Sequence, residues 1–273
     1  MPTTTNRQEV IRPGQTSGLK VAKAGDLTYW ANAMIYGEAN TGKTHLLGSA
    51  SVVECFSPIL IISMDKGEKT LKGCWPDVDV LLPANFMDVQ RILNELFKTG
   101  GKYEGVQYKS LGFDNATTAQ KRGIEYLYDQ EEPSIDFVDF EAATWANGGW
   151  NRSSEQMRRM FDYYGKLPMH KFFTSWARDF GKPTKTNPNP APKWAPSFSS
   201  SLAMEVPGYF DSVLFMKFET VADEKTKKQA DIRVIQSEGT TTVMAKDRDG
   251  GKRLPKIIRE PTMLKLAQGW GLI

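Results

Sequence analysis

An eight-residue segment in the first fifth of the chain has the spacing of glycine, lysine and hydroxyl groups that holds phosphate. It fits G-x-x-x-x-G-K-[ST] and is followed by His45; it reads Gly37-Glu38-Ala39-Asn40-Thr41-Gly42-Lys43-Thr44. Glycines let consecutive backbone N–H groups point at phosphate oxygens, and the N-terminal end of a following helix attracts the same anion. We expect Lys43 to reach the β- and γ-phosphates and the Thr44 hydroxyl to bind magnesium. The segment through His45 therefore predicts a site for ATP and Mg²⁺.

The surrounding residues supply the elements that such a loop needs. An apolar run at 33–36 precedes it, and a helical pattern through Leu46 and Leu47 follows it. This strand–loop–helix context favours a nucleotide site over a glycine-rich turn that binds nothing. Residues 59–62 are continuously apolar, as in a strand buried on both faces of a parallel sheet, and residues 86–97 have helical spacing up to the stop at 100–101.

A second strand carries an acid at its end. The run 110–114 finishes in Asp114, and a helical pattern begins at Ala116. A strand-end aspartate downstream of a phosphate loop holds magnesium directly or through water. We therefore predict Asp114 as the second magnesium residue. The run 171–176 is another expected buried strand, and its polar end is either a γ-phosphate sensor or a simple terminus.

The length and composition of the chain limit the classes of protein to which it can belong. The 273 residues can bury one substantial core, and a charge of +3 gives no case for nucleic-acid binding by itself. Apolar runs are too short to cross a bilayer and the start lacks a signal-peptide profile, so we expect a cytoplasmic protein without membrane contact. Cys55 and Cys74 form no C-x-x-C pair and are expected to be reduced core residues; the two histidines, His45 and His170, offer no zinc cluster.

A proline-rich segment, 178–203, is the candidate for contact with nucleic acid. Five prolines between 183 and 196 exclude a regular helix or central strand. Single-stranded DNA is held by cations along its backbone and by rings that stack on bases. The candidate residues are Lys182, Lys185, Lys193, Trp194 and Phe198. A surface insertion without ligand explains the composition equally well.

Other segments give weaker patterns. The acidic stretch 129–141 is expected to be a solvated loop, and residues 153–156 resemble a capping box that begins a helix. Strands, some of them paired as hairpins, are expected at 210–218, 231–237 and 241–245. Lys246 and Arg248 follow the last of these, and their default interpretation is the ion-paired face of a hairpin.

The order of these parts, over roughly residues 27–260, resembles the RecA-like ATPases, most closely the phage-encoded single-strand annealing ATPases related to RecA and RadA. The resemblance implies an α/β fold: a RecA-like P-loop core with a mainly parallel central sheet flanked by helices and a late β-hairpin region. It implies that Lys246 and Arg248 reach the ATP of a neighbouring subunit. It also implies an acid that activates water, which here is Asp65 in place of the usual glutamate, with Glu68 as the alternative.

The implied protein is an ATPase that binds single-stranded DNA as a homo-oligomer, in a ring or filament with ATP at subunit interfaces, and promotes annealing or strand pairing. A single-strand binding protein is a further expected partner. Residues 1–25 are expected to be a flexible arm, 26–260 the ATPase domain and 261–273 a tail. The alternatives are a hexameric helicase or packaging motor, a nucleotide-gated DNA-binding module with little turnover and, less favoured, a nucleotide kinase.

Overall fold

A mostly parallel sheet forms the centre of the molecule. The computed structural model describes residues 28–131, 148–181, 191–222, 229–248 and 254–273. Within them, ten strands form one sheet, whose main path runs β12-β10-β9-β1-β7-β6-β2-β3. The bounds on this path are β12 Ile257–Arg259, β10 Gln229–Gln236, β9 Ser212–Ala222, β1 Asn32–Gly37, β7 His170–Asp179, β6 Ser110–Asp114, β2 Ile59–Ser63 and β3 Asp79–Leu81.

The strands from β9 to β3 run parallel, and their middle members are buried on both faces. Every residue of β2 and β6 is buried, which explains the apolar sequence of β2 and the small and apolar residues at 111–113 in β6. Two ribbons extend the sheet by antiparallel pairing: β9 with β10, and β7 with β8 (Trp194–Pro196). A further short strand, β11 (Lys246–Asp247), pairs with the start of β9.

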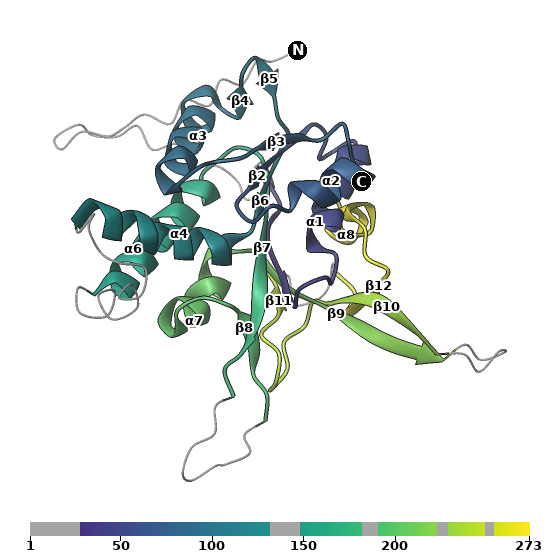
Figure 1. Ribbon diagram of the computed structural model, residues 1–273. Helices are drawn as coiled ribbons and strands as arrows, with labels where there is room; N and C mark the ends of the chain where they lie inside the picture. Colours follow the sequence, from purple (N-terminus) through teal and green to yellow (C-terminus); the bar gives the residue numbers. More distant parts are fainter. Residues whose placement is uncertain (1–27, 132–147, 182–190, 223–228, 249–253) are drawn as a thin grey trace, which may run out of the picture.

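Helices cover both faces of the sheet (Figure 1). One face packs against α3 (Phe86–Thr99), α4 (Ala116–Glu131), α6 (Gly149–Gly165) and α7 (Ser200–Tyr209). The other face packs against α1 (Lys43–Gly48), the 3₁₀ turn η2 (Ser49–Val52), α2 (Glu68–Cys74) and α8 (Met263–Gly269). A separate two-stranded ribbon joins β4 (Lys102–Tyr103) and β5 (Val106–Gln107). Each helical layer packs one of two hydrophobic cores against the sheet.

The expected fold class is confirmed: an α/β core with a mainly parallel sheet flanked by helices and a late hairpin, β9–β10. Several local expectations need correction. Helix α6 begins at Gly149, and the Ser153 hydroxyl donates a hydrogen bond to the Gln120 carbonyl instead of capping a helix. Residues 241–245 form no regular strand, although Val243 makes an isolated bridge to Trp194.

The C-terminal residues are part of the core, contrary to the expected tail. Helix α8 lies against the sheet, and Trp270, which is 2% exposed, stacks on Phe172 with ring centres 6.1 Å apart. Cys55 is half-buried, whereas Cys74 is exposed, which corrects its expected place in the core. The predicted arm at 1–25 and most of the acidic stretch 129–141 lie outside the described residues. Within those residues, none of the helices has the length and apolar character that a membrane crossing requires.

Candidate nucleotide-binding site

The phosphate loop, Gly37–Thr44, joins the end of β1 to the start of α1 at the carboxyl edge of the sheet. A cleft of about 560 Å³ opens beside it, which we call the phosphate cleft. Strand β1 is central, flanked by β7 and β9, so the backbone that carries the loop is fixed on both sides. The residues lining the cleft are Ala39, Asn40, Gly42, Lys43, Thr44, His45, Asp65, Thr70, Cys74, Asp114, Asn115, Trp176 and Arg233.

Lys43 lies folded across its own loop. Its side chain is 8% exposed, and its ammonium group donates hydrogen bonds to the carbonyls of Gly37 at 2.9 Å and Glu38 at 2.7 Å. Burial lowers the pKa of Lys43 to about 8, although the charges of Asp114, Asp65 and Glu38 act in the opposite direction. The loop thus holds a cation at its centre whose charge changes close to physiological pH.

Asp114 meets the loop through hydroxyl groups. Thr44 Oγ1 donates to Asp114 Oδ2 at 2.6 Å, and Thr174 Oγ1, from the middle of β7, donates to Asp114 Oδ1. Because β6 lies between β2 and β7 and is fully buried, its terminal carboxylate is 2% exposed and fixed in direction. Two oxygen ligands from segments 70 residues apart therefore meet at one point.

Asp65 stands beside this pair, just after β2. The side-chain amide of Asn115 donates to Asp65 Oδ2. Burial, followed by the charge of Asp114, raises the pKa of Asp65, while the Gly67 N–H and the Asn115 amide oppose the rise. Glu68, the alternative water-activating residue, begins α2, faces Ser63 Oγ at 3.4 Å and does not line the phosphate cleft. The cleft thus brings together Lys43, Thr44, Asp114 and Asp65.

A comparison with known protein families shows the family to which the chain belongs. The model of the AAA domain matches residues 31–249, which include the loop, Asp65, Asp114 and the late strands. The chain belongs to the AAA domain family. It is therefore a P-loop ATPase domain. No curated protein matches the chain. Among solved structures, it is similar to the crystal structure of the RadB recombinase, with 14% identity, 78% of this chain and 84% of that chain covered, and a TM-score of 0.38.

Two predicted cations of the AAA domain lie away from the phosphate cleft. Strand β11 pairs with Ser212 and Val213, at the amino-terminal end of β9, whereas the phosphate loop is at the carboxyl edge of the sheet. Lys246 donates to the Pro207 carbonyl, and Arg248 pairs with Asp211 at 2.8 Å. Within one chain they do not line the phosphate cleft, so any contact with ATP requires another subunit.

The expected DNA-binding residues divide into three groups. Lys182 and Lys185 lie outside the described residues, while Lys193 is exposed and directly precedes β8. Trp194 is half-buried and stacks on Phe215 at 6.1 Å. Phe198 is 3% exposed and packs against Phe161, which corrects the expectation that its ring stacks on a base.

Sequence reasoning missed five residues of the AAA domain that line the phosphate cleft, and a glycine beside it. The five lining residues are Thr70, Cys74, Asn115, Trp176 and Arg233. Gly67 leaves room for the acids, because a Cβ there would lie 2.5 Å from Asp114 Oδ2. Trp176, 37% exposed, lies within the central strand β7, directly after the polar residues Thr174 and Ser175. Arg233 comes from β10, far along the sequence. Only the Trp176 position had a sequence signal, because it ends the apolar run at 171–176.

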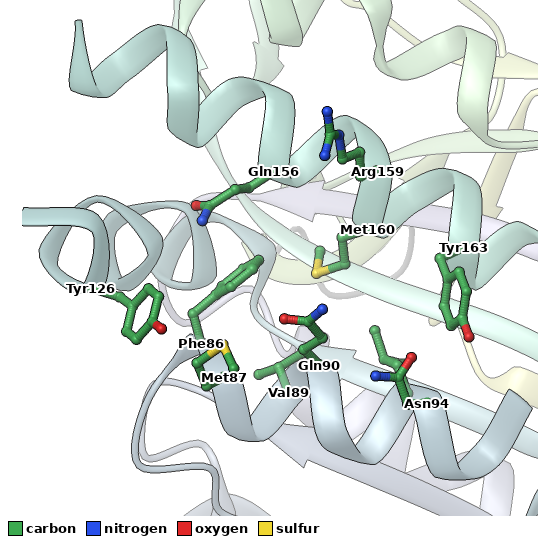
Figure 2. Close-up of a pocket in the computed structure, with 11 residues that line it drawn as sticks. Phe86, Met87, Val89, Gln90, Asn94, Tyr126, Gln156, Arg159, Met160 and Tyr163 are labelled. Carbon is green, nitrogen blue, oxygen red and sulfur yellow. The ribbon is translucent and has the colours of Figure 1, made fainter. Parts of the chain in front are cut away.

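A second hollow of the AAA domain, of about 330 Å³, lies between α3, α4 and α6 (Figure 2). Met160 of α6 faces Phe86 and Val89 of α3 across it, and Tyr163 lies opposite Asn94. Its one charged lining residue, Arg159, is paired with Glu155 at 3.0 Å. This hollow lacks the phosphate loop and the acids, so the phosphate cleft is the candidate site.

Proposed function

We propose that the chain binds ATP with Mg²⁺ in the phosphate cleft and hydrolyses it. The 2.6 Å contact between Thr44 Oγ1 and Asp114 Oδ2, beside Lys43, is the observation that carries this proposal. It joins the two halves of a nucleotide site, a phosphate loop and a strand-end acid. Lys43 donates to the phosphate chain in place of the loop carbonyls, and the first turn of α1 presents its N–H groups to the same anion.

The residues present fit magnesium. Mg²⁺ prefers oxygen ligands, keeps several waters and is held by one or two protein groups together with phosphate oxygens. Thr44 and Asp114 would hold it, and the ion would neutralise charge on the phosphates when bound. In the described part of the chain no group of three or more His, Cys, Asp or Glu side chains could form a denser metal site. Thr174 acts through Asp114, by fixing the direction of its carboxylate.

We assign proton acceptance from the attacking water to Asp65. A raised pKa makes this carboxylate a stronger base than an ordinary aspartate, and Asn115 orients it. Aspartate is one methylene shorter than glutamate, so its reach toward water near the γ-phosphate is smaller. We therefore expect slow turnover, which a bound effector accelerates.

The test is ATP turnover by the purified chain, with and without single-stranded DNA, over a range of protein concentrations. Wild-type protein should hydrolyse ATP and Lys43→Ala should not. Asp65→Asn should bind ATP but turn it over at least about tenfold more slowly, the lower part of the range for general-base catalysis. ATP binding without turnover under every condition would instead favour the nucleotide-gated module. Failure to bind ATP would overturn the proposal.

The effector we propose is single-stranded DNA, bound by exposed groups around the β7–β8 ribbon. Lys121 Nζ lies 4.9 Å from the centre of the exposed Trp176 ring, and the Arg178 guanidinium lies 5.2 Å from the Phe180 ring centre. Alternating cations and rings suit a sequence-independent grip on unstacked bases. Trp176 also lines the phosphate cleft, so this one residue would border both the proposed DNA and the proposed ATP.

This DNA contact predicts a specific loss. Trp176→Ala should weaken binding of a labelled oligothymidylate about tenfold or more, measured by fluorescence anisotropy without nucleotide. Trp150→Ala is the matched control, because Trp150 is equally exposed at the start of α6. Equal affinities of the two variants would refute this surface.

The wider role we propose is that of a cytoplasmic, phage-type recombination protein. It acts as a homo-oligomer, pairs or anneals DNA strands, and works beside a single-strand binding protein. The support is the order of motifs in the sequence together with the exposed cations and rings near the cleft. A strand-annealing assay with complementary labelled oligonucleotides tests it. Directional unwinding of duplex DNA in place of annealing would favour a helicase motor.

A further inference from the structure

Arg233 places a second cation at the phosphate cleft from a distant part of the chain. It lies on β10, opposite Phe218 of β9, and its guanidinium is 5.8 Å from the Phe218 ring centre. It is exposed and lines the phosphate cleft. The ring beneath the guanidinium restricts where its donors can point.

Arg233 also lies beside the loop where phosphate would bind. A Cβ added to Gly42 would lie 2.8 Å from Arg233 Nε, so the arginine side chain occupies the space next to Gly42. Gly42 has φ of 95°, which glycine adopts without strain, and it directly precedes α1. The guanidinium is therefore beside the phosphate loop, directly before the start of α1.

The charge balance of the cleft gives this cation a role. Of the described residues that line it, Lys43 and Arg233 are the lysine and arginine side chains, and Asp65 and Asp114 are acidic. Lys43 alone leaves the two carboxylates in excess, which opposes a polyphosphate. The predicted cations Lys246 and Arg248 are at the other edge of the sheet. Among the described residues that line the cleft, Arg233 is the cation that offsets the second carboxylate.

We propose that Arg233 binds the phosphate chain of the nucleotide in the same subunit. This inference rests on the proposed ATP site and adds a specific binding residue to it. A guanidinium offers several N–H donors in a fixed plane and stays charged at all working pH values. Because Arg233 belongs to the β9–β10 ribbon, nucleotide binding also fixes that ribbon against the phosphate loop.

The test is equilibrium binding of ATP, by calorimetry at several salt concentrations. Arg233→Ala should weaken ATP binding about tenfold to a hundredfold, as expected when a charge-assisted hydrogen bond is lost, and should reduce its salt dependence. Arg233→Lys should recover part of the affinity, because it keeps the charge but loses the planar fork. Arg259→Ala is the control: Arg259 is an exposed arginine on the adjacent strand β12, 3.7 Å from Glu219.

The outcomes separate this inference from the proposed function. Wild-type protein that fails to bind ATP would refute the ATP site itself. Wild-type binding with unchanged affinity in Arg233→Ala would overturn only the role of Arg233. An affinity loss with unchanged salt dependence would also overturn it, since contact with the base and not the phosphates would then explain the loss. Thermal melting of each variant shows that it is folded before binding is compared.

Discussion

The affinity for ATP should depend on pH through Lys43. Burial lowers the pKa of Lys43 to about 8, so the nucleotide-free protein loses this charge as pH rises through that value. A lysine with a pKa of about 8 is about 90% protonated at pH 7 and about 10% protonated at pH 9. If the triphosphate binds the charged form, its dissociation constant should increase about tenfold over this interval, because binding must first restore the proton.

Calorimetric titration of the protein with ATP and excess Mg²⁺, at half-unit steps from pH 6.5 to 9.5, measures this dependence. Lys43→Arg should bind more weakly but show a flat profile, because arginine does not lose its proton in this range. Cys74→Ser is the control for the exposed thiol that also lines the cleft. A wild-type affinity that stays constant from pH 7 to 9 would refute the reasoning about Lys43.

Further predictions concern Asp114, the core and the subunit interface. Thr174→Val should raise the Mg²⁺ concentration needed for half-maximal ATP binding about tenfold or more, whereas Thr117→Val, which removes a buried hydroxyl paired with Ser175, should leave it unchanged. Phe198→Ala should lower the free energy of unfolding in urea by about 3–5 kcal/mol as a core truncation, and a change below about 1 kcal/mol would contradict its burial. Mixing Lys43→Ala with Arg248→Ala should restore part of the ATPase activity if Arg248 acts across a subunit boundary; no recovery at any mixing ratio would argue against that role.

Local sequence was sufficient for the phosphate loop and for the buried parallel strands. The loop motif is contiguous, and its glycines and lysine have the same physical meaning in any fold that puts a strand before it and a helix after it. Strands β2 and β6 are buried on both faces, so the apolar residues in each indicated a buried strand without any knowledge of the adjacent strands. Asp114 could be predicted because it ends such a strand.

Other residues could not be placed from local patterns. Trp194 and Phe198 were candidates for base stacking because a proline- and lysine-rich segment usually lies at the surface, but both pack against distant aromatic rings. The C-terminal residues have a short apolar pattern, and it is the stacking of Trp270 on Phe172 that makes them part of the core. Exposure is a property of the packed fold, which composition does not determine.

The sequence by itself determined that this chain carries a phosphate loop, because the groups that form such a loop are adjacent in the chain. Only the tertiary structure decided which acids and cations complete the site. The order of strands places Asp114 beside Thr44 and Asp65 beside Asn115. The β9–β10 ribbon places Arg233 beside Gly42. The same sheet separates Lys246 and Arg248 from the cleft, because β11 pairs with the opposite end of β9. Sheet order and strand direction set these distances, and no local spacing encodes them.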